Sequence, residues 1–192
     1  MNFPGNCFYN HKEQKMWLDI PKNASKSVSH NLLKMGWKNG NYIKDKNHHY
    51  EAVIVVRDVV SRWKGSTIEI CYHHHIHHSK YDFSNFEHWF NSRNWENFEK
   101  RGDLHHQPLS YFCRDLHNPH YIAMDNNFSK TINDVLGIND LRTINSTVEN
   151  EHKLRIEPYV DELLVNTDFM KKLLDYYAED QAIFLAASNI SK

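Results

Sequence analysis

The feature that most constrains the fold is the run AVIVV at residues 52–56, in which five apolar residues follow one another and four are β-branched. A strand with apolar side chains on both faces has to be covered on both, which is typical of a central strand in a parallel sheet. A second apolar run, MWLDI at residues 16–20, ends at Pro21, which has no N–H group for a ladder hydrogen bond. Residues 121–124 form a third candidate strand.

Helices are predicted between and after these strands. Residues 25–35 carry Val28, Leu32 and Met35 at helical spacing, and Gly36 is a plausible stop. The segment 39–47 is rich in glycine and asparagine and is predicted to be a loop. Further helices are expected over residues 59 to about 78, over 83–98, over 129–136 with Gly137 as the stop, over 158–164 with Pro158 in the first turn, and over 167–187 with Thr167 or Asp168 as the cap.

This order of elements predicts an α/β protein in which a short parallel sheet is flanked by helices in three layers. The length of 192 residues is sufficient for one compact domain with a core, so a single domain over residues 1–192 is expected. The formal net charge of -1 argues against a general nucleic-acid-binding protein. No stretch resembles a signal peptide or a membrane span, and the three cysteines are widely spaced, so a cytoplasmic protein without a membrane partner is expected.

The segment PKNASKS at residues 21–27 lies where the first strand passes into a helix. A helix N-terminus at the carboxyl end of a strand presents free N–H groups and a positive dipole end, which suit a phosphate or sulfate. Lys22 adds charge, Ser25 and Ser27 add hydroxyl donors, and Ala24 allows close approach of the backbone. A Walker A loop does not fit, because Ile20 and Ser25 stand where that motif has glycines. A solvent-facing turn is the alternative.

Arg57 directly follows the strand 52–56 and can reach the same edge of the sheet. Its planar guanidinium suits a phosphate group. The alternative is an ordinary surface ion pair with Asp58, which would contribute little.

The two segments PKNASKS (21–27) and VRDVVSRWKGS (56–66) together resemble the sulfotransferase superfamily, most closely the Golgi-type carbohydrate sulfotransferases and their small bacterial and viral relatives. Weaker similarity continues in order along the chain at residues 103–112 (DLHHQPLSYF), 121–138, 144–147 (INST) and 173–184 (LLDYYAEDQAIF). The resemblance implies a P-loop-like fold and transfer of a sulfuryl group from 3′-phosphoadenosine 5′-phosphosulfate (PAPS). The acceptor would be a hydroxyl on a small molecule or carbohydrate, 3′-phosphoadenosine 5′-phosphate (PAP) would be the product, and no metal is implied.

The resemblance also assigns roles to residues. Lys22 would stabilise the leaving phosphate, and Arg57 would hold the 3′-phosphate. The cofactor loop would comprise Pro21, Lys22, Asn23, Ala24, Ser25, Lys26 and Ser27. The serine that the family places eight residues after Arg57 is Gly65 here, so Ser66 or Ser61 would have to replace it. Lys26 is the other departure, because it stands where the family has a hydroxyl.

A general base is needed to remove the proton of the acceptor, and histidine is well matched to this task. His105 corresponds to the family's histidine and is the first candidate, followed by His49; His48 and His106 also stay open. The 15 histidines include a run at residues 73–78, but it lacks the spacing of a structural zinc site, so no metal site is predicted. Two other functions are open: an ATP-dependent small-molecule kinase and a non-catalytic nucleotide-binding protein with the same fold.

Overall fold

The structure, a computed structural model, describes residues 6–41, 49–76, 78–80, 82–98, 104–113, 116–139, 141 and 150–190. The chain divides into two compact units. Unit 1 comprises Met1–Asp58, Gln107–Ile144 and Glu179–Lys192, and unit 2 comprises Val59–His106 and Asn145–Ala178. The single domain over residues 1–192 stays a prediction. No helix within the described ranges is long and apolar enough to cross a membrane.

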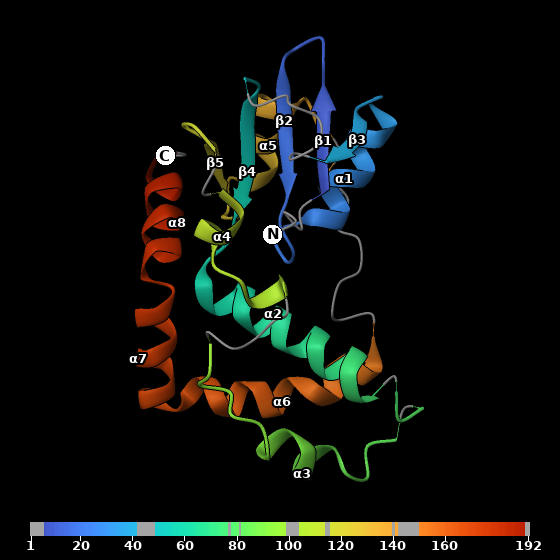
Figure 1. Ribbon diagram of the computed structural model, residues 1–192, viewed down its shortest axis with the longest axis vertical. Helices are drawn as coiled ribbons and strands as arrows, with labels where there is room; N and C mark the ends of the chain where they lie inside the picture. The colour runs from blue at the N-terminus through green and yellow to red at the C-terminus, as the bar shows by residue number, and fades with distance from the viewer. Residues whose placement is uncertain are drawn as a thin grey trace. The chain divides into compact units, whose positions relative to one another are not determined.

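Unit 1 is built on an open sheet of five strands (Figure 1). In spatial order the strands are β3 (Lys38–Asn41), β1 (Asn6–Asn10), β2 (Lys15–Asp19), β4 (Glu51–Val56) and β5 (His120–Ala123). The strands β2, β4 and β5 run parallel, as predicted, whereas β1 pairs antiparallel with both β2 and β3. The sheet is therefore mixed rather than parallel. The sequence gives little signal for β3, because its residues KNGN carry no apolar side chain.

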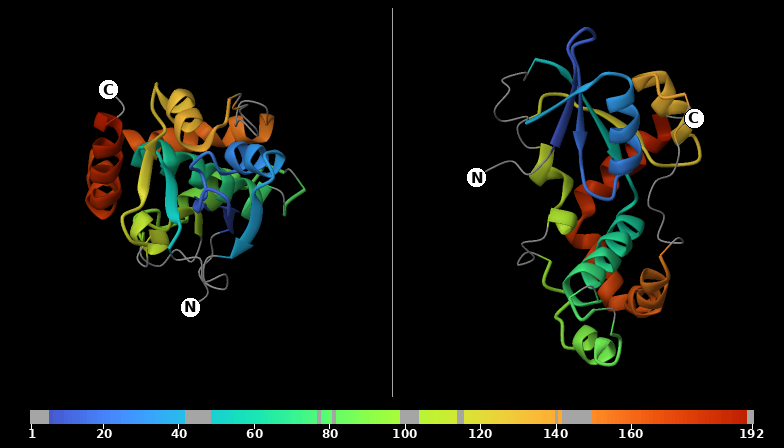
Figure 2. Two further views of the ribbon diagram at one scale, coloured as in Figure 1. Left: turned by 90° about the horizontal axis from the view of Figure 1, so that it is seen from above. Right: turned by 90° about the vertical axis from the view of Figure 1, so that its right-hand side faces the viewer.

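Helices cover both faces of this sheet (Figures 1 and 2). One face packs against α1 (Ser25–Lys34) and α5 (Phe128–Leu136), and the other packs against α4 (Leu109–Cys113) and α8 (Ala178–Ile190). Val53 and Val55 of β4 belong to the first layer of contacts, and Ile54 and Val56 belong to the second. The run AVIVV is thus buried on both faces, as its composition predicts.

The helices α1 and α5 confirm the predicted segments and their stops. Gly36 and Gly137 both adopt positive φ, at 84° and 71°, which ends each helix in the left-handed conformation that glycine adopts without strain. At the end of α5 the N–H of Gly137 donates to the carbonyl of Asn133 at 2.7 Å.

Unit 2 consists of helices around an aromatic core. They are α2 (Val59–Cys71), which continues into a π-helical turn at Tyr72–Ile76, then α3 (Phe86–Asn91), α6 (Glu151–Val165) and α7 (Thr167–Tyr176). The core includes Trp63, Phe90, Phe98 and Phe169. A largely buried ion pair between Glu69 and Lys153 joins α2 to α6, since both side chains are about an eighth exposed (12% and 13%).

Three of the helices predicted between residues 83 and 187 have the wrong bounds. The helix expected over 83–98 is limited to the six residues of α3. Pro158 does not open a helix but lies inside α6, which begins at Glu151 after the cap Asn150. The helix expected over 167–187 is two helices that meet at Tyr177, and α7 is capped by Asn166 rather than by Thr167 or Asp168.

Candidate functional site

The carboxyl ends of β2, β4 and β5 bring three loops of unit 1 to one edge of the sheet. Trp17 pairs with Val53 and Val56 pairs with Ala123, both in parallel register. Residues 20–24, 57–58 and 124–127 therefore leave the sheet at the same edge, which is where open α/β sheets bind ligands. The N–H of Met124 donates to the carbonyl of Val56 at 2.7 Å and extends this alignment beyond β5.

The loop between β2 and α1 turns sharply through two left-handed residues. Lys22 has φ 67° and Ala24 has φ 58°, and the N–H of Asn23 donates to the carbonyl of Ile20 at 3.2 Å. Each non-glycine residue in this conformation costs about 1–2 kcal/mol. Lys22 and Ala24 thus adopt a conformation that glycine reaches without strain. Such strain is typical of loops with a functional role.

The turn places the N-terminus of α1 at the carboxyl edge of the sheet. The first helical bond of α1 runs from the N–H of Val28 to the carbonyl of Ala24 at 3.0 Å, so the N–H groups of residues 25–27 precede the helical ladder. Ala24 occupies the cap position without a side-chain hydrogen bond, and the first turn contains no acidic residue. The predicted strand, loop and helix are therefore confirmed as elements, and the end of the helix suits an anion.

The side chains of this loop differ in exposure. Lys22 and Ser25 are half-buried, Ser27 is 8% exposed and Lys26 is exposed. The Asn23 side chain is 1% exposed, and neither its Oδ1 nor its Nδ2 has a hydrogen-bond partner among the described residues. An unpaired buried amide is rare in folded proteins.

Arg57 follows β4 at the same edge and is half-buried. Burial lowers the pKa of its guanidinium, while the charge of Asp58 acts in the opposite direction. The group stays charged, since arginine begins from a very high pKa. A partly desolvated guanidinium attracts an anion more strongly than one in bulk water.

Sequence reasoning missed Asp19, the last residue of β2. Burial raises the pKa of its carboxyl group to about 6, and a hydrogen bond with the Ser25 side chain lowers it in part. The signal was present in the sequence as an acidic residue inside an apolar run, two positions before Pro21.

His49 does not lie at the carboxyl edge of the sheet. It precedes β4, whereas Lys22 and Arg57 follow the carboxyl ends of β2 and β4. The six residues of β4 span about 20 Å, so His49 lies at the opposite edge of the sheet. Its exposed ring contacts Tyr50 edge to face, with centroids 4.6 Å apart. This geometry argues against His49 as the general base, and His48 lies outside the described residues.

Ser66 and the histidines at 105 and 106 belong to unit 2. Ser66 is fully buried, and its hydroxyl lies 2.9 Å from the carbonyl of Arg62 and 2.8 Å from that of His105. These contacts favour a structural role for Ser66. His105 is half-buried in the short helix Leu104–His106. His106 is buried, with its Nε2 3.0 Å from Thr67 Oγ1 and its ring stacked on Trp63.

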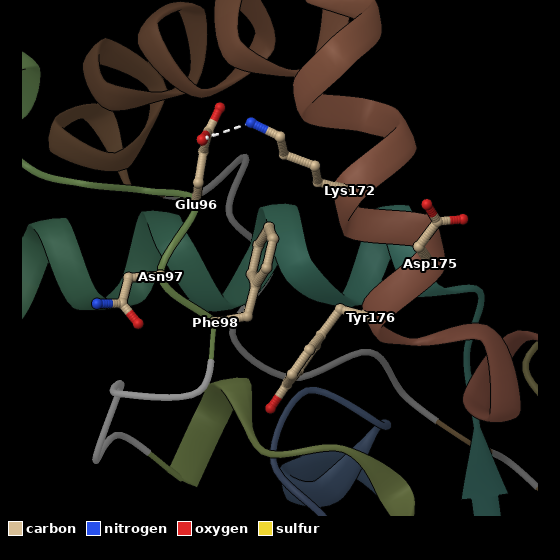
Figure 3. Close-up of a pocket in the computed structure, with 6 residues that line it drawn as sticks. All are labelled: Glu96, Asn97, Phe98, Lys172, Asp175 and Tyr176. Atoms are coloured by element: carbon tan, nitrogen blue, oxygen red, sulfur yellow. Dashed lines mark hydrogen bonds and ion pairs between the residues drawn. The ribbon is translucent and has the colours of Figure 1, made fainter.

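Unit 2 also carries a shallow pocket of about 460 Å³ that the sequence did not predict (Figure 3). The ion pair between Glu96 Oε2 and Lys172 Nζ, at 2.7 Å, lies at one side of it. The rings of Phe98 and Tyr176 stack with centroids 5.3 Å apart at another side. The described residues contain no group of three or more histidine, cysteine or acidic side chains that could hold a metal ion.

Comparison of the chain with models of known protein families, with curated proteins and with solved structures finds no significant match.

Proposed function

We propose that the chain is a PAPS-dependent sulfotransferase that acts on a hydroxyl group, with the anion site at the carboxyl edge of the sheet in unit 1. The observation that carries the proposal is the loop 20–24, which turns into an uncapped helix N-terminus beside the strand end that bears Arg57. The segment PKNASKS supports it through its resemblance to the loop that holds the 5′-phosphosulfate.

In this reaction the acceptor oxygen forms a bond to sulfur while the bond from sulfur to the bridging phosphate oxygen breaks. The leaving phosphate takes the electron pair, and the proton of the acceptor hydroxyl passes to water. The Lys22 ammonium would stabilise the charge that develops on the leaving oxygen, and the N–H groups of residues 25–27 would hold the 5′-phosphate. Arg57 would hold the 3′-phosphate by two parallel hydrogen bonds. His105 belongs to unit 2, so the proposal rests on Lys22 and Arg57 alone.

The donor class is tested by thermal unfolding with PAP, PAPS, ATP with Mg²⁺, and no ligand. A ligand that binds the native state raises the melting temperature. We expect PAP and PAPS to raise it and ATP with Mg²⁺ to have little effect. A response to ATP with Mg²⁺ alone would overturn the proposal in favour of a kinase.

The role of Lys22 is tested by comparing Lys22→Ala with Lys34→Ala, which removes the same charge from the exposed last turn of α1. Sulfuryl transfer to a panel of hydroxyl compounds should fall roughly a hundredfold or more in Lys22→Ala, because a transition-state contact is lost. The shift caused by PAP should largely remain. Equal transfer rates in the two variants would show that Lys22 is not at the reaction centre.

A non-catalytic nucleotide-binding protein is the second candidate. It is favoured by the position of His49, a candidate general base, at the opposite edge of the sheet from Lys22 and Arg57. A PAP response without transfer to any hydroxyl compound would support it.

A further inference from the structure

Lys26 lies in the first turn of α1, where its charge opposes the helix dipole. The helix begins at Ser25, and Lys26 is the second residue of a first turn that contains no acidic side chain. The N-terminus of a helix carries a partial positive charge, so a lysine at this position destabilises the helix. The Lys26 side chain is exposed, and no residue in the described part of the chain forms an ion pair or hydrogen bond with its ammonium group.

The other end of the same helix shows the opposite arrangement. Lys34 lies in the last turn of α1 and is also exposed. The C-terminus of a helix carries a partial negative charge, which favours a lysine there. The helix thus carries one lysine at each end, and only Lys34 matches the dipole.

The acidic residues at the carboxyl edge of the sheet do not compensate the charge of Lys26. Asp58 lies next to Arg57, and its charge acts on that guanidinium. Asp125 accepts a backbone N–H of its own loop at 2.8 Å. Asp19 is half-buried at the end of β2. Within the described ranges, none of the three carboxylates forms an ion pair with Lys26.

The backbone of α1 directs the Lys26 side chain toward the anion site. The bonds from Cα to Cβ in an α-helix tilt toward its N-terminus. The side chain of the second helical residue therefore leaves the helix in the direction of the N–H groups of residues 25–27, which precede the first helical bond from Val28 to Ala24. A long, flexible lysine side chain can follow an anion bound at these groups.

An independent observation at the same helix end concerns Asn23, which directly precedes the cap residue Ala24. Its side chain is 1% exposed, and neither its Oδ1 nor its Nδ2 has a partner among the residues that the structure describes. A buried amide that lacks both partners marks a position where a further polar group is expected. An unpaired amide and an uncompensated lysine thus both lie at the N-terminus of α1.

We propose, resting on the function proposed above, that Lys26 binds the anionic group of the ligand at the N-terminus of α1. Its ammonium donates hydrogen bonds to oxygens of the anion that the N–H groups of residues 25–27 hold. No proton is transferred and no covalent bond forms. The charge that destabilises the ligand-free helix stabilises the complex, so Lys26 has effects of opposite sign on stability and on binding.

The first test compares Lys26→Gln with Lys34→Gln in the absence of ligand. Glutamine has nearly the same helix propensity as lysine, so each variant differs from the wild type mainly by one charge. We expect the melting temperature to rise by about 1–3 °C in Lys26→Gln and to fall by a similar amount in Lys34→Gln. A melting temperature that falls in Lys26→Gln would overturn the inference.

The second test measures the affinity of the same variants for inorganic sulfate and for PAP by NMR titration. We expect both ligands to bind about fivefold more weakly to Lys26→Gln, because a charged hydrogen bond is lost. The affinities of Lys34→Gln, and of Lys26→Arg, which keeps the charge, should stay within about twofold of the wild type. The loss in Lys26→Gln should shrink at about 0.5 M NaCl, since salt screens an exposed charge. Equal affinities in Lys26→Gln and Lys34→Gln would refute the role of Lys26.

The outcomes separate the two proposals. A wild-type protein that responds to neither PAP nor PAPS contradicts the proposed function, and a sulfate affinity that still falls in Lys26→Gln would then support the anion contact by itself. A wild-type protein that binds PAP, with no loss of affinity in Lys26→Gln, contradicts only the role of Lys26. Both lysines are exposed, so their substitution should leave the fold intact.

Discussion

Asp19 is a carboxylic acid that burial holds near half-protonation at about pH 6. Its ordinary pKa is 3.8, so the folded protein binds more protons at this position than the unfolded chain does between these two values. The stability associated with Asp19 is therefore greatest below about pH 4 and is lost as the pH rises through 6. The loss amounts to at most about 3 kcal/mol, and solvent screening of a partly exposed group reduces it.

Asp19→Asn should accordingly stabilise the protein at pH 8 and have little effect near pH 4. Urea unfolding at pH 4, 6 and 8 measures the difference in the free energy of unfolding between the variant and the wild type. We expect this difference to grow with pH in favour of the variant. Asp134→Asn, which removes an exposed carboxylate from α5, is the matched control and should show a small difference that does not grow with pH. The same pattern in Asp19→Asn would show that the pKa of the Asp19 carboxyl is not perturbed.

Among the helices, the ends of α6 and α7 are fixed by asparagine caps. The Oδ1 atom of Asn166 accepts from the N–H groups of Asp168 and Phe169 at 3.1 Å and 3.0 Å, and Asn150 caps α6 in the same way. An asparagine also precedes α3, but the Asn85 side chain makes no cap hydrogen bond. Asn166 and Asn85 thus both stand at the N-terminus of a helix, but only Asn166 caps it with hydrogen bonds.

Asn166→Ala should lower the free energy of unfolding by about 1 kcal/mol, because two N–H groups lose their acceptor. Asn85→Ala is the matched control and should change it by less than about 0.5 kcal/mol. Chemical denaturation of both variants at one pH measures these values. Equal effects would mean that the Asn166 cap contributes no more than an ordinary surface side chain.

The spacing of apolar residues in the sequence did not predict the break between α7 and α8. Apolar residues continue at helical spacing across it, from Phe169 to Phe184. Tyr177 at the break is buried, and its hydroxyl donates to the carbonyl of His106. Asp180, just beyond the break, accepts the N–H of Leu109 at 2.9 Å in unit 1. The residues on the two sides of the break thus make their hydrogen bonds within different units. The spacing of apolar residues along the chain does not indicate this.

At the scale of the whole molecule, the division into two units separates the candidate residues into two groups. The chain leaves unit 1 after Asp58 and returns to it at Gln107. The connection from β4 to β5 therefore contains α2, α3 and the short helix Leu104–His106 of unit 2, and α6 and α7 follow later in the chain. Lys22 and Arg57 share unit 1, while Ser66 and His105 share unit 2.

Hydrogen exchange with and without PAP tests the placement of the anion site in unit 1. We expect the largest gain in protection in peptides that cover residues 19–28 and 53–58, since ordering of a loop by a ligand slows its local opening. Peptides from α6 and α7 serve as the internal comparison. Protection confined to those helices would place the ligand elsewhere and contradict the site.

The sequence by itself determined the parallel strands, the helices α1 and α5, and the strand, loop and helix at residues 16–35. These features depend on local composition: a doubly apolar run, proline and glycine stops, and apolar residues at helical spacing. The candidate residues Lys22 and Arg57 followed from the same patterns, because the ends of parallel strands share an edge.

Only the tertiary structure decided the rest. The antiparallel pairing of β3 depends on a neighbouring strand rather than on its own polar residues, and the displacement of His49 depends on strand direction. The burial of Asp19, Asn23 and Ser66 depends on what packs around them. Ionisation and hydrogen bonding are set by the surroundings in space, and a sequence pattern reports only the neighbours along the chain.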